Sequence, residues 1–377
     1  MSRINDLIKE LCPNGVVFKS IDSVADLYYG KGNNIPKDGG EYPVYGCYGI
    51  VSSTSTFNNE DTPIVGHIGS AGKVSWGAGK HYVTYNGTIC NPKDRKELNS
   101  RYLYYILLDL HLENYVKGSQ PFLSSSDFGP IKIPVPPVEV QNEIVKILDK
   151  FGELEAELEA ELEARKSQYE FWRGNIFNNI TSTFKTIKEL CIDIIVPMRD
   201  KPKVFDGHIP WCRIEDKEGN YFNTSKSGQF VSEETIKKMN LKVFPEGTVI
   251  CSCSASIGTY AINTQPLITN QTFIGLVCGD EIINKYLFYY MQTQTSHLLE
   301  LSNSGTIPYI SRKKFEDLMV PVPPIEEQKR IINILDKFDS LINDITVGLP
   351  AEIELRRKQY EYYRNKLLSF EELSVSE

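Results

Sequence analysis

The sequence predicts an α+β protein in which two α+β domains are joined by two long, antiparallel, coiled-coil-like helices, with a pseudo-twofold internal repeat. Three observations predict this class. Two parts of the chain repeat each other, each copy begins with short β-rich runs between Gly, Asn and Ser turns, and each copy ends in a long apolar stripe at helical spacing. A chain of 377 residues also suits two medium domains, because domains cluster near roughly 100–150 residues.

The repeat is clearest at the end of each predicted domain. IPVPPVEVQNEIVKILDKF (133–151) matches VPVPPIEEQKRIINILDKF (320–338) at a constant separation of 187 residues. Further along, RKSQYEFWR (165–173) matches RRKQYEYYR (356–364) at a separation of 191 residues. The chain is therefore two copies of one plan, and the second copy has gained four residues between its two blocks.

Weaker similarities link the earlier parts of the two copies. They pair 102–105 with 286–289, and 118–124 with 305–311. The sequence between them differs widely, since CYGIVSSTSTFNNEDTPIVGHIGSAGKVSW has little in common with the stretch around WCRIEDKEGNYFNTSKSGQF. Two similar frames thus hold two different surfaces, as expected if each surface binds a different target.

Proline clusters mark the end of each domain. Pro lacks an N–H and restricts the residue before it, so the chain must leave the domain extended before a helix starts. The predicted order is a first domain with a short N-terminal helix, a central helix, a second domain and a C-terminal helical segment, over 1–137, 138–178, 179–324 and 325–377.

The two long helices each carry an apolar stripe at spacings of three and four residues. The stripes consist of Ile144, Ile147, Leu148, Phe151, Leu154, Leu158, Leu162, Tyr169 and Trp172 in the first helix, and Ile331, Leu335, Phe338, Leu341, Ile345, Leu349, Ile353, Tyr360, Tyr363 and Leu367 in the second. Two such stripes can bury each other, and we expect them to pack antiparallel. Gly348 and Pro350 are expected to break or kink the second helix.

Composition argues against several protein classes. No apolar run approaches the ~18 residues of a membrane span, and MSRINDLIKEL lacks the apolar stretch of a signal peptide, so we expect a cytoplasmic protein. Eight sparse cysteines and five scattered histidines predict neither a disulfide framework nor a metal site.

The net charge of −8 arises almost entirely in the helical segments, because 1–137 carries 13 acidic and 13 basic side chains and 174–324 carries 15 of each. The domains can therefore still present basic surfaces.

The arrangement resembles the specificity subunits of type I restriction-modification systems. The resemblance covers essentially the whole chain and is carried by the duplicated PVPP-x3-Q-x6-LDKF blocks, the RKSQYEFWR and RRKQYEYYR ends, and the dissimilar domains before each block. It implies two target-recognition domains that read the two halves of a split double-stranded DNA target, held apart by the helices. It also implies two methyltransferase (M) subunits packed around those helices, and restriction/translocase (R) subunits that join for cleavage.

The resemblance assigns the chemistry to those partners. It places S-adenosylmethionine, for adenine N6 methylation, together with ATP and Mg²⁺ on the partner subunits, and no cofactor on this chain. The sequence agrees, since it lacks an Asn/Asp-Pro-Pro-aromatic methylation motif, and Gly66–Lys73 departs from a P-loop in spacing and in Val74. We therefore predict no catalytic residue and no metal site. The alternatives are an assembly scaffold that reads no DNA and a self-sufficient methyltransferase or nuclease.

The tetrapeptide repeat EAEL-EAEL-EA at 155–164 allows two interpretations. It is either an ordinary solvated stretch of helix or a ruler between the two domains. Each unit adds about 6 Å of helix, close to two base-pair rises of ~3.4 Å. Under the second interpretation the number of units sets the distance between the half-sites.

Base readout needs Arg, Lys, Asn, Gln, Ser or Thr side chains on loops that can enter a groove. The candidates for DNA binding are Lys31, Asn33, Ser70, Lys73, Lys117, Ser119 and Gln120 in the first domain, and Arg199, Lys201, Lys203, Arg213, Ser254, Ser256, Thr306, Arg312 and Lys313 in the second. The alternative for each is an ordinary solvated side chain. The helix aromatics are predicted to pack helices or bind partner subunits rather than stack on bases, and the partner-binding candidates are Phe151, Tyr169, Trp172, Phe338, Tyr360 and Tyr363.

Overall fold

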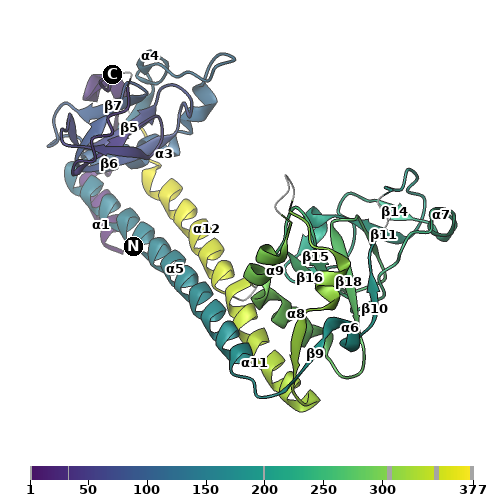
Figure 1. The fold of residues 1–377 in the computed structure, drawn as a ribbon. Coiled ribbons are helices and arrows are strands. Elements are labelled where there is room, and N and C mark those ends of the chain that lie inside the picture. The colour runs from purple at the N-terminus through teal and green to yellow at the C-terminus, as the bar shows by residue number, and fades with distance from the viewer. Residues whose placement is uncertain (1, 33, 198–199, 304–307, 344–347, 374–377) are drawn as a thin grey trace. The chain divides into compact units, whose positions relative to one another are not determined.

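The computed structural model describes residues 2–32, 34–197, 200–303, 308–343 and 348–373 (Figure 1). The chain divides into two compact units. Unit 1 comprises Met1–Glu157 with Glu354–Glu377, and unit 2 comprises Leu158–Ile353. Each unit therefore contains one domain together with parts of the long helices.

Unit 1 is built on a six-stranded sheet in the order β2-β7-β5-β6-β3-β4. All neighbours are antiparallel except β3 and β6, which pair parallel. The strands are β2 (Ala25–Tyr29), β3 (Tyr42–Tyr45), β4 (Ile50–Thr54), β5 (Asn59–Gly66), β6 (Val74–Val83) and β7 (Gly87–Pro92). A separate antiparallel pair joins β1 (Val17–Ser20) to β8 (Lys132–Val135).

Helix α3 (Ser100–Asp109) covers the sheet of unit 1 against β5 and β6 (Figure 1). Asn99 begins it, because its side chain accepts hydrogen bonds from the backbone N–H groups of Arg101 and Tyr102. The shorter helices are α1 (Ser2–Leu11), α2 (Ile21–Val24), the 3-10 helix η1 (Leu112–Tyr115) and α4 (Ser125–Phe128). Ile144 and Leu148 of helix α5 (Val138–Asn178) are fully buried in the same core as Tyr102, so the start of α5 belongs to this unit.

Unit 2 has a six-stranded sheet in the order β10-β18-β15-β16-β13-β12, a three-stranded sheet β14-β11-β17 and the pair β9-β19. The strands are β9 (Thr183–Thr186), β10 (Cys191–Ile195), β11 (Ile209–Cys212), β12 (Lys217–Glu218), β13 (Tyr221–Phe222), β14 (Phe230–Val231), β15 (Val249–Ser252), β16 (Tyr260–Asn263), β17 (Ile268–Thr269), β18 (Phe273–Cys278) and β19 (Met319–Val322). The helices are α6 (Ile187–Leu190), η2 (Ile214–Asp216), α7 (Glu233–Met239), α8 (Asn284–Thr293), α9 (Thr295–Leu301) and α10 (Arg312–Glu316).

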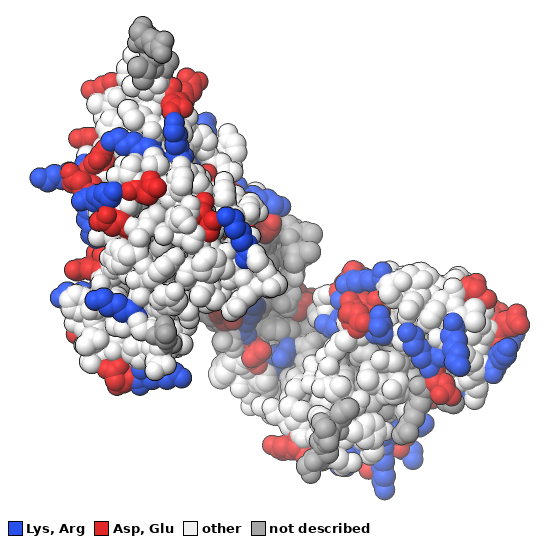
Figure 2. All heavy atoms as spheres, turned by 90° about the horizontal axis from the view of Figure 1, so that it is seen from above, with Lys and Arg blue, Asp and Glu red and all other residues white. Residues whose placement is uncertain are grey.

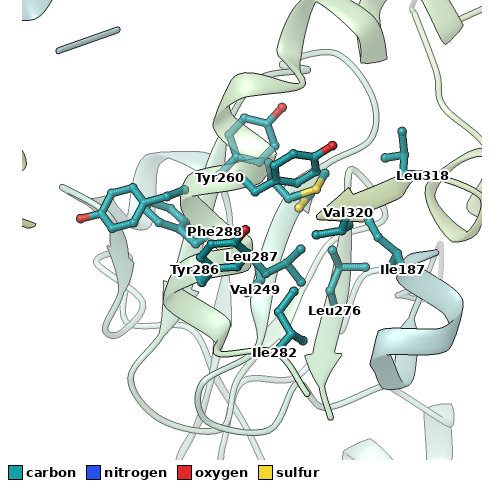
Figure 3. Close-up of a cluster of buried hydrophobic side chains, with 14 of the residues drawn as sticks. Ile187, Val249, Tyr260, Leu276, Ile282, Tyr286, Leu287, Phe288, Leu318 and Val320 are labelled. Atoms are coloured by element: carbon teal, nitrogen blue, oxygen red, sulfur yellow. The ribbon is translucent and has the colours of Figure 1, made fainter. Parts of the chain in front are cut away.

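Helix α8 supplies much of the core of unit 2. Its Tyr286 and Leu287 are fully buried among Val249 of β15 and Leu276 of β18 (Figure 3). Residues from the long helices complete the same cluster, namely Tyr169 and Phe177 of α5 and Ile331, Leu335 and Ile342 of α11 (Ile325–Asn343). Each domain thus uses a long helix as part of its own hydrophobic core.

The long helices follow the predicted plan. Helix α5 runs from Val138 to Asn178 without interruption, α11 spans Ile325–Asn343, and α12 spans Leu349–Leu368. The predicted break is confirmed, because Gly348 precedes the first residue of α12 and Pro350 lies in its first turn, where a missing N–H costs little. The inserted residues 344–347 lie outside the described residues.

The predicted antiparallel pairing is present within unit 1. The Phe151 ring of α5 lies 5.5 Å from the Tyr363 ring of α12. One turn further along α5, Glu155 Oε1 lies 2.6 Å from Arg357 Nε. Because residue numbers rise along α5 while they fall along α12, the two helices run in opposite directions.

A buried glutamine ties each domain to its long helix in the same way. Gln141 accepts a hydrogen bond from Asn99 N and donates to Glu97 O and Pro136 O, at 2.7–2.8 Å. Gln328 accepts from Ile283 N and donates to Glu281 O and Pro323 O, at 2.9–3.0 Å. Both side chains are fully buried. The repeated glutamine of the sequence is therefore a repeated structural joint.

Candidate nucleic-acid interface

Two loops distant in sequence interlock at one end of the sheet in unit 1. Gly69 N donates to Pro121 O at 3.3 Å, and Leu123 N donates to His67 O at 3.0 Å. Gly72 of the first loop packs against η1, the helix that leads into the second loop, and a Cβ at Gly72 would lie 2.5 Å from Glu113 N. The structure thus brings the predicted residues Ser70 and Lys73 together with the predicted Lys117, Ser119 and Gln120.

The turn that carries Lys31 lies beside these loops. Lys31 N donates to Val83 O at 2.9 Å, and Tyr85 N donates to Gly32 O at 3.2 Å. His67 N in turn donates to Asn86 O at 2.8 Å, which links the turn at 84–86 to the loop at 66–73. Asn33 lies outside the described residues.

An aromatic cluster that sequence reasoning missed lies among the same loops. The buried His67 ring lies 4.0 Å from Tyr29, 4.6 Å from Phe122 and 5.6 Å from Tyr85, measured between centroids. His67 Nδ1 is 2.8 Å from Leu123 O, which holds the ring in place. Tyr85 and Phe122 remain 38% and 39% exposed. Their closeness in sequence to two predicted loops was the signal that could have identified them. Together, Tyr85 and Phe122 form an exposed apolar surface beside the polar and cationic side chains of the loops.

The lysines of this surface differ in how strongly they are held. Lys117 Nζ lies 2.5 Å from Asp127 Oδ1. This bond and the hydrogen bonds from Ser124 lower the pKa of Asp127 to about 2. Neither Lys31 nor Lys73 forms an ion pair within 4.0 Å among the described residues. These two cations are therefore the more available for phosphate contacts.

The corresponding loops of unit 2 also converge. Ala255 N donates to Pro308 O at 3.4 Å, Ile310 N donates to Cys253 O at 2.8 Å, and Ser254 pairs with Tyr309 in an isolated β-bridge. This places the predicted residues Ser254 and Ser256 near the start of α10. That helix carries the predicted Arg312 and Lys313, and Arg312 Nε lies 2.6 Å from Glu316 Oε1. Thr306 lies outside the described residues.

A second group of predicted residues gathers on the three-stranded sheet of unit 2. Lys201 Nζ lies 5.1 Å from the Trp211 ring centroid, and Arg213 Cζ lies 5.8 Å from the same centroid. Arg213 also forms an ion pair with Glu215 at 3.1 Å. Lys203 is exposed nearby in sequence, and Arg199 lies outside the described residues. Lys and Arg are interspersed with Asp and Glu on the face seen in Figure 2.

The predicted partner-binding aromatics fall into two groups. Five of the six pack against other residues of their own unit: Phe151 with Tyr360 and Tyr363 in unit 1, and Tyr169 with Phe338 in unit 2. Trp172 is 48% exposed, and its neighbour Phe171, which sequence reasoning missed, is 64% exposed. Tyr362 matches Phe171 at the separation of 191 residues and is 60% exposed. The repeat thus leaves one exposed aromatic ring at the same helix position in each unit.

The described residues also bear on metal binding and on membrane insertion. Within the described parts of the chain, no group of three or more His, Cys, Asp or Glu side chains is arranged to hold a metal ion. None of the helices described is long and apolar enough to cross a membrane. The prediction that this chain carries no cofactor remains a prediction.

Comparison with known proteins gives consistent matches. The family model described as "Type I restriction modification DNA specificity domain" matches twice, at residues 13–164 and 179–355. The type I restriction enzyme EcoR124I/EcoR124II specificity subunit of Escherichia coli is 34% identical over 75% of this chain and 73% of its own length. The type I restriction enzyme specificity subunit S.HindORF215P of Haemophilus influenzae is 30% identical over 94% of this chain and 96% of its own.

A solved structure of the type I R-M system, described in terms of complex assembly and conformational transition, has the same fold. It matches with a TM-score of 0.66 and 14% identity, over 94% of this chain and 98% of the matched chain. At that identity the similarity concerns the fold alone.

Proposed function

Because the chain belongs to the type I restriction-modification DNA specificity family, we propose that its two domains read the two halves of a split double-stranded DNA target. Family membership gives this chain the role of a non-catalytic specificity subunit. The finer statement, that recognition is bipartite, rests on the duplication. Each copy of the family domain has its own sheet, its own loops and its own buried glutamine joint.

The observation that carries the proposal is the contrast between conserved joints and divergent loops. Gln141 and Gln328 make the same three hydrogen bonds in the two copies. The loops that the joints support differ in sequence and in strand arrangement, with a three-stranded sheet present in unit 2. A protein that binds two different sequences needs a common framework to position each domain and different loops to contact different bases. Phosphate contacts position a domain, whereas base contacts specify the sequence.

In the first domain, the interlocked loops of unit 1 are the proposed reading surface. Lys31 and Lys73 would contact phosphates, while Ser70, Ser119 and Gln120 can exchange hydrogen bonds with base edges. Tyr85 and Phe122 add apolar contact area. In the second domain, Ser254, Ser256 and the basic residues of α10 take the equivalent place.

The helices are the proposed docking sites of two methyltransferase subunits, with restriction subunits joining for cleavage. Exposed Phe171, Trp172 and Tyr362 support docking there, since large exposed aromatics are enriched at interfaces. S-adenosylmethionine, ATP and Mg²⁺ would then be bound by the partners, and the complex would act in the cytoplasm.

Methylome sequencing tests the proposal. A methylation-free host would express this chain with its methyltransferase partner subunit, and a control host would express the methyltransferase alone. We expect adenine methylation at one asymmetric split motif, absent from the control. This result would also provide both half-site sequences and the spacer length.

The rival function is an assembly scaffold that reads no DNA. If a purified, soluble complex methylates no motif, or the same motif as the methyltransferase alone, the proposal of DNA reading is wrong. Exchanging 179–324 for the corresponding segment of a related chain provides the matched test, because only one half-site should then change.

A further inference from the structure

Two equivalent arginines occupy different electrostatic surroundings. Arg364 of α12 and Arg173 of α5 match at the separation of 191 residues. In unit 1, Arg364 Nε donates to Asp109 Oδ1 at 3.2 Å, and its side chain is 14% exposed. Its guanidinium carbon also lies 5.7 Å from the Tyr360 ring centroid. The partly buried cation of unit 1 therefore has a carboxylate from its own chain.

Arg173 of unit 2 keeps the aromatic contact and lacks the carboxylate. Its guanidinium carbon lies 5.0 Å from the ring of Tyr169, which matches Tyr360. Its Nη1 donates to Gln292 Oε1. Its Nε, the atom whose equivalent binds Asp109 in unit 1, is buried and has no hydrogen-bond partner among the described residues.

The missing carboxylate has a clear position in the repeat. The match of 102–105 with 286–289 gives a separation of 184 residues between helices α3 and α8. At this separation Thr293 stands where Asp109 stands in the first copy. The Thr293 hydroxyl donates to Tyr290 O at 2.7 Å, so it satisfies its own helix and supplies no negative charge.

Arg173 lines a cavity of about 680 Å³ that lies within unit 2. The other polar groups that line it include Lys217, Asn220, Thr259, Thr295 and Ser296. Lys217 is half-buried and its ammonium group donates to Gly219 O. Burial lowers the pKa of this group. A cavity with two cations and several hydroxyl groups is suited to an anion with several oxygens.

Nearby acids do not take the place of Asp109. Asp339 accepts hydrogen bonds from Asn220 at 2.7 Å and from Asn343 at 2.9 Å. Glu170 lines the same cavity but is exposed to solvent. The buried Nε therefore remains a donor without an acceptor, and leaving such a charged donor unsatisfied is costly.

We propose that this cavity binds an oxyanion, either a phosphate or a carboxylate, at the Arg173 guanidinium, in the role that Asp109 has in the first copy. The inference goes beyond DNA reading, because it concerns the junction of α5 with α8 rather than the loops. The oxyanion is either a free ion or a carboxylate presented by a bound partner subunit.

Thermal unfolding of the full chain in inorganic phosphate, compared with chloride at equal ionic strength, tests the site. We expect phosphate to raise the Tm of the wild type by roughly 3 °C more than the Tm of Thr293→Asp. That substitution supplies the carboxylate in cis and should remove the specific response. General salting effects act on both proteins alike and cancel in the comparison.

The reciprocal variant Asp109→Thr provides a matched control in unit 1. It should create a second unpartnered arginine and enlarge the phosphate response. Equal responses of the wild type and Thr293→Asp would overturn the proposal. If Thr293→Asp does not fold, calorimetric titration of the wild type with phosphate tests the site instead. Saturable binding supports the proposal, and its absence overturns it.

Repeating the titration with the methyltransferase subunit bound distinguishes the two sources of oxyanion. A response retained in the complex assigns the site to a free ion. If phosphate binds the free chain but no longer binds the complex, a carboxylate of the partner subunit occupies the site. Either result supports an oxyanion site.

Discussion

Arg101 of α3 and Lys285 of α8 occupy equivalent places in the two copies and reach equivalent carboxylates. Arg101 Nε lies 2.8 Å from Asp149 Oδ1, and Lys285 Nζ lies 2.7 Å from Asp336 Oδ2. A tyrosine one turn further along each helix donates to the same carboxylate, at 2.5 and 2.6 Å. The type of cation has changed while the contact between domain and long helix has been kept.

Positions nearer the proposed reading surface differ more. Asp127 holds Lys117 in the first copy, whereas the matching residue of the second copy, at the separation of 187, is Lys314. Lys314 instead donates to Leu301 O. The contacts that attach each domain to its long helix are therefore the same in both copies. The charge of a side chain near the proposed reading surface, in contrast, can be opposite in the two copies.

The largest effect is expected from shortening the helix between the two copies. Deleting Glu159–Leu162 removes four residues from α5, about 6 Å of helix. We expect the complex to lose methylation of its original motif and to methylate the same half-sites with a spacer shorter by about two base pairs. Methylome sequencing measures the change, and an unchanged motif in a soluble complex would rule out the ruler.

The next largest effect is expected at the glutamine joints. Replacing Gln141 by Leu removes the hydrogen-bond partner of two carbonyl groups and one N–H that lie in buried or partly buried positions. The free energy of unfolding should fall by about 3 kcal/mol or more, measured by urea denaturation. Gln328→Leu should cost a similar amount if the two joints are equivalent. Lys146→Gln, at an exposed position of α5, is the control, and equal costs for Gln141→Leu and this control would contradict the prediction.

The sequence allowed the frame of the fold to be predicted because its determinants are local. Pro136 and Pro137 forbid helix before Val138, and the apolar stripe continues at helical spacing to the end of α5. Gly348 and Pro350 likewise located the break between α11 and α12. Because the sequence repeats, the same predictions could be made for the second copy.

The candidate site could be predicted only in part. Residue type identified Ser70 and Lys117 as candidates, but their convergence depends on backbone hydrogen bonds between segments some fifty residues apart. Helical spacing identified Phe151, which packs against Tyr363. It missed the exposed Phe171, because the spacing of apolar residues does not reveal which aromatic side chains remain exposed after the helices pack. The Arg173 cavity was invisible in the sequence, since the absence of one carboxylate matters only once burial is known.

A smaller effect is expected from a single phosphate contact in the first copy. Lys73→Ala should weaken DNA binding by about 1 kcal/mol and reduce the slope of log K against log salt by about 1. The loss should be similar for every sequence of the first half-site, because a phosphate contact carries no base information. Fluorescence anisotropy at several salt concentrations measures both quantities for the methyltransferase complex.

Lys80→Ala is the matched control for that measurement. Lys80 lies on β6, the strand that begins directly after Lys73, and is seven residues from Lys73, therefore roughly 23 Å away along the chain. We expect its DNA affinity and salt slope to equal those of the wild type. Equal losses in both variants would show that the cations act only through net charge.

The smallest effect is expected at the position where the two copies carry opposite charge. Lys117 and Ser124 lower the pKa of Asp127 from its usual 3.8 to about 2, so the carboxylate stabilises the fold above about pH 4 and loses this contribution as pH falls towards 2. Asp127→Asn should therefore lower the free energy of unfolding by about 1 kcal/mol or less at pH 7, discounted for solvent screening around the exposed Lys117. Urea denaturation at pH 7, 5 and 3 measures the difference from wild type, which should shrink at the lowest pH. A difference independent of pH would mean that Asp127 acts through the shape of its turn, and that the sign of the charge at this position matters little to the first copy.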